Sequence, residues 1–218
     1  MDLGLERAGM TCVAQVEIDP WCQRILEKHW PDVPKYGDIR DVGKHNLPAA
    51  QLIAGGFPCQ PHSVAGKRKG ADDDRNLWPE YFRIIKEMRP AWVVGENVPG
   101  IITTYLDTVL SDLEGAGYEV GVFNLPACGF DAPHRRERIF IVGYPHCTGL
   151  EEQWGIVSDG EEYEAPERAG RWAIEPGVDR VVDGVPNRVD RVKGLGNAVV
   201  PQVAEFIGKY ILETDRLI

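Results

Sequence analysis

The sequence predicts an α/β fold, doubly wound, with a mostly parallel sheet and helices on both faces. Through the first 145 residues, short apolar runs typical of strands alternate with amphipathic helical segments. Several of these runs end in glycine or polar residues, where the loops at the edge of a sheet begin. The composition, 43% hydrophobic and 27% charged over 218 residues, is that of a globular domain with its own core.

The elements of the N-terminal quarter follow this alternation. Residues 1–10 (MDLGLERAGM) are expected to form a helix, and residues 11–18 a strand. A second helix is expected over 19–30, with Asp19 as N-cap and Pro20 at the first helical position. A doubly wound domain normally begins with a strand and a glycine-rich turn, and no such strand precedes the first helix here. The two strands that would flank it are therefore expected to have unpaired edges.

The elements further along continue the pattern. Pro201 opens a final helix whose apolar positions recur every three or four residues, at Val203, Phe206, Ile207 and Ile211. Residues 145–190 are irregular, so we divide the chain into a core (1–144), an acidic insert (145–193) and a C-terminal helix returning to the core (194–218). The other predicted elements are strands over 51–57, 91–98, 118–125 and 136–144 and helices over 77–89 and 104–117.

Charge and cysteine content limit the classes of function. The net charge of −10 argues mildly against nucleic-acid binding, but residues 151–190 carry eleven acids and four bases, so most of the negative charge lies there. Five cysteines without a CxxC pair indicate neither a disulfide framework nor a metal site, and a reduced cytoplasmic setting is expected. No apolar run approaches about 18 residues, so no membrane span is predicted, and the N-terminus does not resemble a signal peptide.

The stretch AGGFPCQPHSVAGKRKG (54–70) places Cys59 between two prolines and ahead of a basic cluster, Lys67, Arg68 and Lys69. A cysteine after a strand is often a small buried hydrophobic residue. The flanking prolines stiffen this loop, and nearby positive charge favours a thiolate, so the loop also fits a nucleophile.

Three further segments carry candidate site residues. GENVPG (95–100) places Glu96 at the tip of a predicted strand. Arg136 and Arg138 alternate at the start of another strand, so that both point to one face. GLGNAVVPQ (194–202) precedes the final helix. Each of these is weak alone, because a strand-tip glutamate can be a loop cap and an arginine pair is usually solvated.

Taken together and in this order, the motifs GFPCQPHS, GENV, HRRER and GNAVVP resemble those of the cytosine-C5 DNA methyltransferases. VEIDPWC and YGDIRD resemble the second and third cofactor motifs of that family. The resemblance covers nearly the whole chain. It implies a Rossmann-like fold of the S-adenosylmethionine-dependent methyltransferases, with a reduced target-recognition region.

The resemblance also implies roles for the site residues. Cys59 would be the nucleophile that adds to C6 of a flipped-out cytosine, and Glu96 would hold N3. Arg138 would contact the base carbonyl, and Arg136 would support the loop. The remaining implied contacts are to DNA, from Gln60, Ser63, Lys67, Arg68 and Lys69.

The cofactor implied is S-adenosyl-L-methionine. Glu17 would bind the ribose hydroxyls and Ile18 the adenine face, with Asp38 and Ile39 completing the adenine site. For Ile18, Ile39 and Leu77, plain core packing is the alternative interpretation. The residues expected along the methionine side and the carboxylate end are Pro58, Leu77, Asn197 and Ala198.

The chain departs from the family pattern in three places. His62 stands where the family usually has Phe or Tyr, and His134 stands where it usually has Gln. These two differences are expected to alter the activity without abolishing it. The sequence begins after the family's first strand and its Phe-x-Gly-x-Gly-Gly turn, so weak cofactor binding is expected. The region between the arginine and Gly-Asn motifs, 145–193, is only 49 residues long and acidic.

Several functional alternatives remain open at this stage. The expected partner is double-stranded DNA, for a monomeric enzyme of a bacterial or phage-infected cytoplasm. A restriction endonuclease encoded elsewhere would be a second partner. An RNA-directed cytosine methyltransferase shares the chemistry. A catalytically impaired nucleic-acid-binding remnant is a different class. A dinucleotide oxidoreductase is the most distant, because GxGxxG is absent.

Overall fold

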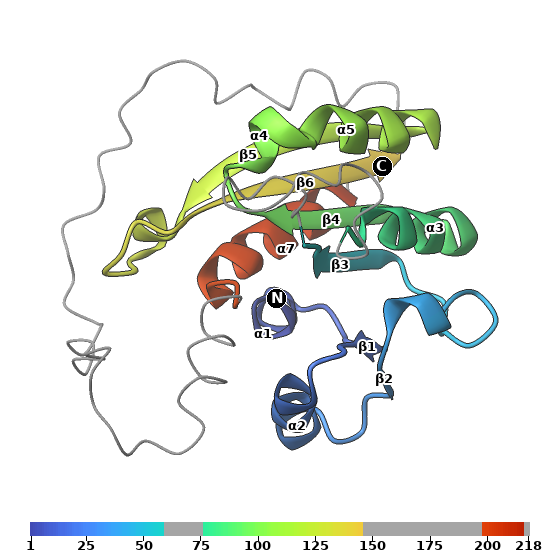
Figure 1. The fold of residues 1–218 in the computed structure, drawn as a ribbon. Helices are drawn as coiled ribbons and strands as arrows, with labels where there is room; N and C mark the ends of the chain where they lie inside the picture. Colours follow the sequence, from blue (N-terminus) through green and yellow to red (C-terminus); the bar gives the residue numbers. More distant parts are fainter. Residues whose placement is uncertain (59–75, 146–197, 216–218) are drawn as a thin grey trace, which may run out of the picture.

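The computed structural model describes residues 1–58, 76–145 and 198–215, and these form an α/β fold (Figure 1). A four-stranded sheet lies at its centre in the order β3-β4-β6-β5. The α/β class predicted from the sequence is confirmed. The strands are β3 (Leu52–Gly56), β4 (Trp92–Asn97), β6 (Glu137–Pro145) and β5 (Tyr118–Pro126).

Strand directions in this sheet are mixed. β3 and β4 run parallel, with Gly56 opposite Glu96, whereas β6 is antiparallel to both β4 and β5. β5 and β6 are joined through the short 3-10 helix η3 (Ala127–Phe130) without a crossover helix, and such a connection returns the chain antiparallel. Parallel pairing is therefore found on the β3 side of the sheet, and antiparallel pairing on the β5 side.

Two further strands form a separate parallel pair. β1 (Gln15–Val16) pairs with β2 (Lys35–Tyr36). The strand predicted over 11–18 is thus much shorter than expected, because only two of its residues find a partner.

The helix that follows, α2 (Pro20–His29), begins where Asp19 and Pro20 predicted. The Asp19 carboxylate accepts hydrogen bonds from the N–H groups of Trp21 and Cys22 at 2.9 and 3.3 Å.

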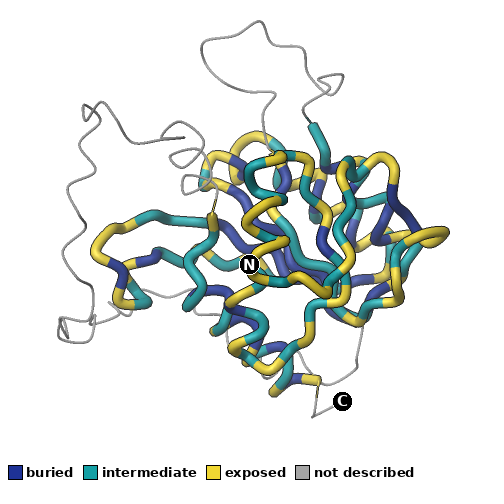
Figure 2. The backbone as a smooth tube through the Cα atoms, turned by 90° about the horizontal axis from the view of Figure 1, so that it is seen from below, coloured by how far each residue is buried: buried dark blue, intermediate teal, exposed yellow. Residues whose placement is uncertain are grey.

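One face of the sheet is covered by α3 (Trp78–Met88), α4 (Ile101–Thr104) and α5 (Leu106–Gly115). Side chains from these helices and from alternate strand positions form a buried cluster that includes Trp78, Ile85, Val93 and Ile141. The helix predicted over 104–117 is α5, which begins only at Leu106, because Tyr105, with φ −148°, separates it from the short α4. In Figure 2 the buried stretches (dark blue) lie mainly inside the fold.

The opposite face is covered by α1 (Asp2–Ala8) and α7 (Pro201–Asp215), which cross closely (Figure 1). A Cβ on Gly4 would lie 2.3 Å from the carbonyl oxygen of Pro201, and one on Gly208 would lie 2.7 Å from Ala8 Cβ. Glycine at these two positions therefore allows the helices to touch. The cluster beneath them contains Trp92, Val94, Phe140, Val142, Tyr144, Val203, Ile207 and Ile211.

Two expectations for the C-terminal part need comment. Phe206 was predicted to face the core with Val203 and Ile207, but it is half exposed and packs at a tilt against Phe130, with ring centroids 5.4 Å apart. The predicted acidic insert, 145–193, lies almost entirely outside the described residues, so its division from the core stays a prediction. No helix among the described residues is long and apolar enough to span a membrane.

Candidate active site

Glu96 lies at the carboxyl end of β4, where the predicted site residues converge. It is buried, and its Oε1 accepts from Arg138 Nε of β6 at 2.9 Å. A Cβ on the facing Gly56 would lie only 2.8 Å from Glu96 Oε2. The glycine that ends β3 therefore leaves room for this carboxylate.

Burial raises the pKa of the Glu96 carboxyl above its ordinary value of 4.5. Three positive charges oppose this rise: Arg138, Arg136 and the terminal ammonium of Met1. The carboxyl is thus shielded from water yet held beside a guanidinium. A group in this state can give a proton to, or share one with, a neutral acceptor placed at the same edge of the sheet.

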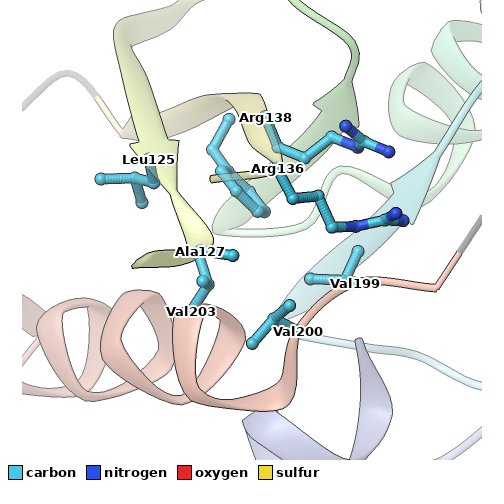
Figure 3. A pocket seen from close by; sticks show the side chains of 8 residues that line it. Leu125, Ala127, Arg136, Arg138, Val199, Val200 and Val203 are labelled. Carbon is cyan, nitrogen blue, oxygen red and sulfur yellow. The ribbon is translucent and has the colours of Figure 1, made fainter. Parts of the chain in front are cut away.

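The two arginines lie at the start of β6 and extend to the same side, as predicted (Figure 3). Arg136 precedes the strand with a positive φ of 30°, and its Nη2 donates to the carbonyl oxygen of Ala198 at 2.7 Å. Burial, followed by the charge of Arg138, lowers the pKa of Arg136. Arg136 therefore links the beginning of β6 to the segment that leads into α7, and Arg138 is the arginine that pairs with Glu96. A small pocket beside them is lined mainly by apolar residues: Leu125, Ala127, Phe140, Val199, Val200 and Val203.

Asn97, next to Glu96, is a polar residue at the strand tip to which the sequence analysis assigned no role. It is 5% exposed, and its side-chain amide donates to the carbonyl oxygen of Phe57 at 2.9 Å. Its Oδ1 accepts from the N–H of Val98, also at 2.9 Å. One amide thus fixes the exit of β3, two residues before Cys59, to the tip of β4. A polar amide at the end of an apolar strand was the available signal, but its partner lies 40 positions away.

The predicted nucleophile and its loop, residues 59–75, lie outside the described residues, as does Asn197. The same holds for the predicted DNA contacts Gln60, Ser63, Lys67, Arg68 and Lys69. Pro58, the last described residue before the loop, is exposed and directly follows the buried Phe57. The chain therefore enters the loop at the edge of the sheet that carries Glu96.

The residues predicted to bind the cofactor divide by position. Glu17 follows β1 and Asp38 follows β2, so both carboxylates lie at the same edge of this parallel pair. Glu17 Oε1 accepts from the N–H of Asp19 at 2.8 Å, and Asp38 caps the 3-10 helix η1 (Ile39–Asp41) through the N–H of Arg40. The remaining predicted residues are the partly buried Leu77, at the N-cap of α3, and the exposed Ala198.

The two isoleucines of this set have different surroundings. Ile18 is 63% exposed, which contradicts plain core packing and leaves an apolar surface next to Glu17. Ile39 is partly buried against the cluster under α3. Its backbone carbonyl accepts from Arg83 Nη2 at 3.0 Å, and the carbonyl of Val42 accepts from the same atom at 2.9 Å. The exposed apolar face and the two carboxylates fit a purine nucleoside with ribose hydroxyls. Within the described ranges no group of three or more His, Cys, Asp or Glu side chains could hold a metal ion.

The fold and this site define a class: an α/β domain with an acid–arginine pair at the carboxyl edge of its parallel strands. The sequence profile of the C-5 cytosine-specific DNA methylases matches residues 1–168, more than half of the chain. The chain therefore belongs to the C-5 cytosine-specific DNA methylase family.

Individual relatives agree with this assignment. The chain is 33% identical over 154 residues to the type II methyltransferase M.HgiCII of Herpetosiphon aurantiacus, a match covering 68% of this chain and 35% of the relative. It is 34% identical over 155 residues to M.BsuFI of Bacillus subtilis, covering 69% and 38%. Among solved structures, a prophage-encoded DNA modification methyltransferase (E. coli) aligns with a TM-score of 0.56 and 27% identity, covering 66% of this chain and 42% of that one. The chain thus spans little more than a third of these curated relatives.

Proposed function

We propose that this protein transfers a methyl group from S-adenosylmethionine to carbon 5 of cytosine in DNA, through a covalent bond between Cys59 and C6 of a flipped-out base. The observation that carries the proposal is the ion pair between the buried Glu96 and the partly buried Arg138, at the edge of the sheet where β3 leads to Cys59. Family membership supports the reaction class. Double-stranded DNA is the proposed substrate and partner.

The residues divide the chemistry among them. The Cys59 thiolate adds to C6, and the electron pair displaced from the ring is stabilised as the Glu96 carboxyl donates its proton to N3. Arg138 pairs with Glu96, and Arg136 donates to the carbonyl oxygen of Ala198. Arg138 is proposed to contact the base carbonyl as well. The cofactor supplies an electrophilic methyl group, which C5 accepts. A solvent base then removes the C5 proton, the C6–S bond breaks, and N3 returns its proton to Glu96.

The raised pKa of Glu96 supports this assignment, because a carboxyl that keeps its proton more readily than in water is a better donor to N3. Glu17, Ile18, Asp38, Ile39 and Leu77 are proposed to hold the nucleoside part of the cofactor, with Pro58, Asn197 and Ala198 toward its methionine end. Lys67, Arg68 and Lys69 are proposed to meet DNA phosphates, and Gln60 and Ser63 the DNA around the flipped base.

The test is covalent trapping on DNA that contains 5-fluorocytosine. Fluorine at C5 blocks the final elimination, so an adduct formed with cofactor present survives denaturation. Peptide mapping should place it on Cys59, and Cys59→Ser should abolish it. Cys128→Ser is the matched control, because Cys128 is an exposed free thiol and its loss should leave the adduct unchanged.

Cys12 is a poor nucleophile at neutral pH. Burial, then the charge of Asp2, raises the pKa of Cys12 to about 11, so only about one molecule in ten thousand carries that thiolate at pH 7. An adduct on Cys12, Cys22, Cys128 or Cys147 would contradict the proposal. Incubation with labelled cofactor and either DNA or RNA distinguishes the possible substrates. Label on RNA alone would show that RNA, and not DNA, is the substrate. Label on neither would indicate a catalytically impaired nucleic-acid-binding protein.

A further inference from the structure

Arg83 extends from α3 to the loop that follows β2. Its Nη2 atom donates to the carbonyl oxygen of Ile39 at 3.0 Å and to that of Val42 at 2.9 Å. Ile39 begins the short helix η1, and Val42 directly follows η1 as its C-cap. One nitrogen atom therefore holds both ends of η1, the turn that Asp38 caps.

The rest of the guanidinium is fixed from its own helix. Arg83 Nε donates to Glu80 Oε2 at 2.7 Å, and Nη1 donates to Glu87 Oε1 at 2.9 Å. The other oxygen of Glu87 accepts from the backbone N–H of Lys44 at 3.1 Å. A Cβ on Gly43 would collide with this oxygen, so glycine at this position leaves room for it. α3 therefore holds the loop at η1 and again just beyond it.

The same helix is anchored to the main sheet by Tyr81. This side chain is buried, and its hydroxyl oxygen lies 3.1 Å from the carbonyl oxygen of Val94 on β4 and 3.3 Å from that of Ile53 on β3. The hydroxyl donates to one of these oxygens or shares its proton between them. Because Val94 lies two positions before Glu96, α3 has a fixed place relative to the strand that carries this carboxylate.

The contacts of Arg83 within its own helix are ordinary. Ion pairs three or four positions apart on a partly exposed helix face contribute little, so those with Glu80 and Glu87 alone would indicate only a solvated surface. The two bonds from Nη2 differ, because they reach residues 44 and 41 positions away. A guanidinium suits this role, since its planar fork presents five donors in fixed directions, whereas an ammonium has one nitrogen.

The connection through α3 matters for the geometry of the proposed reaction, which needs the nucleoside part of the cofactor at a set distance from Glu96. The β1–β2 pair and the main sheet share no strand pairing within residues 1–58, 76–145 and 198–215. Arg83 and Tyr81 lie two positions apart on α3 and link the two parts through side chains. The position of Asp38 therefore depends on α3.

We propose that Arg83 is a positioning residue for cofactor binding, because it holds η1 against α3 and so sets where Asp38 and Ile39 meet the adenine ring. This inference rests on the adenine contacts proposed above for those two residues. Arg83 acts through them and takes no part in bond making.

The experiment measures the affinities of the full chain for S-adenosylhomocysteine and S-inosylhomocysteine by calorimetric titration. The second compound has an oxo group in place of the adenine amino group, so it cannot donate that hydrogen bond to Asp38. Arg83→Lys should weaken S-adenosylhomocysteine binding about tenfold and S-inosylhomocysteine binding much less, so the ratio of the two affinities should fall at least about threefold. A ratio of affinities does not depend on the fraction of folded protein.

The matched control is Arg89→Lys. Arg89 Nη1 donates to the carbonyl oxygen of Ala116 at 2.7 Å, at the other end of α3, so its loss should leave the ratio unchanged. A second check combines Arg83→Lys with Asp38→Asn. Arg83→Lys should weaken S-adenosylhomocysteine binding less in that background than in the wild type, because the contact that Arg83 positions is already gone.

An unchanged ratio in Arg83→Lys, an equal fall in Arg89→Lys, or full additivity with Asp38→Asn would overturn the positioning role alone. Failure of the proposed function would be seen in the wild type instead. A wild-type chain that binds neither compound would overturn the cofactor assignment, and one that binds both equally would overturn the adenine contact of Asp38. Either result would also remove the basis for the role of Arg83.

Discussion

Replacing Asn97 tests whether one buried amide sets the distance between the Cys59 loop and Glu96. Asn97→Ala removes two hydrogen bonds, to the Phe57 carbonyl and from the Val98 N–H, both 2.9 Å long. Each is worth about 1 kcal/mol net, and leaving the Phe57 carbonyl buried without a donor brings the expected loss to about 2–4 kcal/mol. Asn97→Asp keeps an oxygen that accepts from the Val98 N–H, but it places a carboxylate oxygen against the carbonyl oxygen of Phe57, where the amide had donated a hydrogen bond.

The matched control is Tyr118→Phe. The Tyr118 hydroxyl donates to the carbonyl oxygen of Pro90 at 2.7 Å, in a buried site at the other end of β4. Its removal should cost about 1–3 kcal/mol in unfolding free energy without touching the site. The assay compares the rate of 5-fluorocytosine adduct formation per folded molecule, with unfolding free energies from denaturant titration.

We expect adduct formation to slow by about 100-fold in both Asn97 variants, because a shift of about 1 Å in a reacting group has an effect of that size. Cofactor affinity should fall much less than the adduct rate, since Glu17 and Asp38 follow the strands of the separate β1–β2 pair and only Pro58 adjoins Phe57. An adduct rate at the wild-type level in Asn97→Ala, or an equal fall in Tyr118→Phe, would refute the positioning role.

The remaining predictions concern Glu96 and its surroundings. Glu96→Gln should slow turnover by about 10²–10⁴-fold with nearly unchanged cofactor affinity; full activity per folded molecule would make Glu96 a structural cap. The pKa of Glu96 is raised in the folded state, so the cost of burying its charge is absent below pH 4.5 and grows as pH rises through the folded pKa. The unfolding free energy of the wild type, measured relative to that of Glu96→Gln, should therefore fall over that pH window. A rise in this difference would contradict the direction of the pKa shift. Gly56→Ala should displace the Glu96 carboxylate, because its Cβ would lie 2.8 Å from Glu96 Oε2, and should lower kcat at least about tenfold. Gly55→Ala is the control and should keep its kcat, because its Cβ would lie 3.4 Å from the Tyr81 ring. Similar kcat values in the two variants would refute the steric argument.

Local signals in the sequence predicted local structure well. Asp19 and Pro20 correctly predicted where α2 begins, because an N-cap interacts only with residues two or three positions further along the chain. Pro201 likewise begins α7, as predicted. Glu96, Arg136 and Arg138 were predicted as a group from the family motifs, and the structure brings them to one edge of the sheet. The assigned roles of these three residues stay predictions.

What depended on distant partners was not predictable in the same way. The strand at 11–18 shrank to Gln15–Val16, because strand length is set by pairing and β1 has one described partner. The antiparallel direction of β6 follows from the short connection after β5, and the apolar pattern of β6 itself does not predict that direction. Phe206 has the helical spacing of a core residue, yet that position of α7 lies at the rim near Phe130. Asn97 acts through Phe57, which no spacing rule connects to it.

The contact between α1 and α7 has a consequence for how this face of the sheet folds. Gly4 lies against Pro201 and Ala204, so α1 docks on a helix that is far from it in sequence. The cluster under these helices also includes Trp92 and Phe140, which lie between the two helices in sequence. Because contacts this distant in sequence form late, that face of the sheet stays accessible to chaperones and proteases until α7 has been synthesised and has docked.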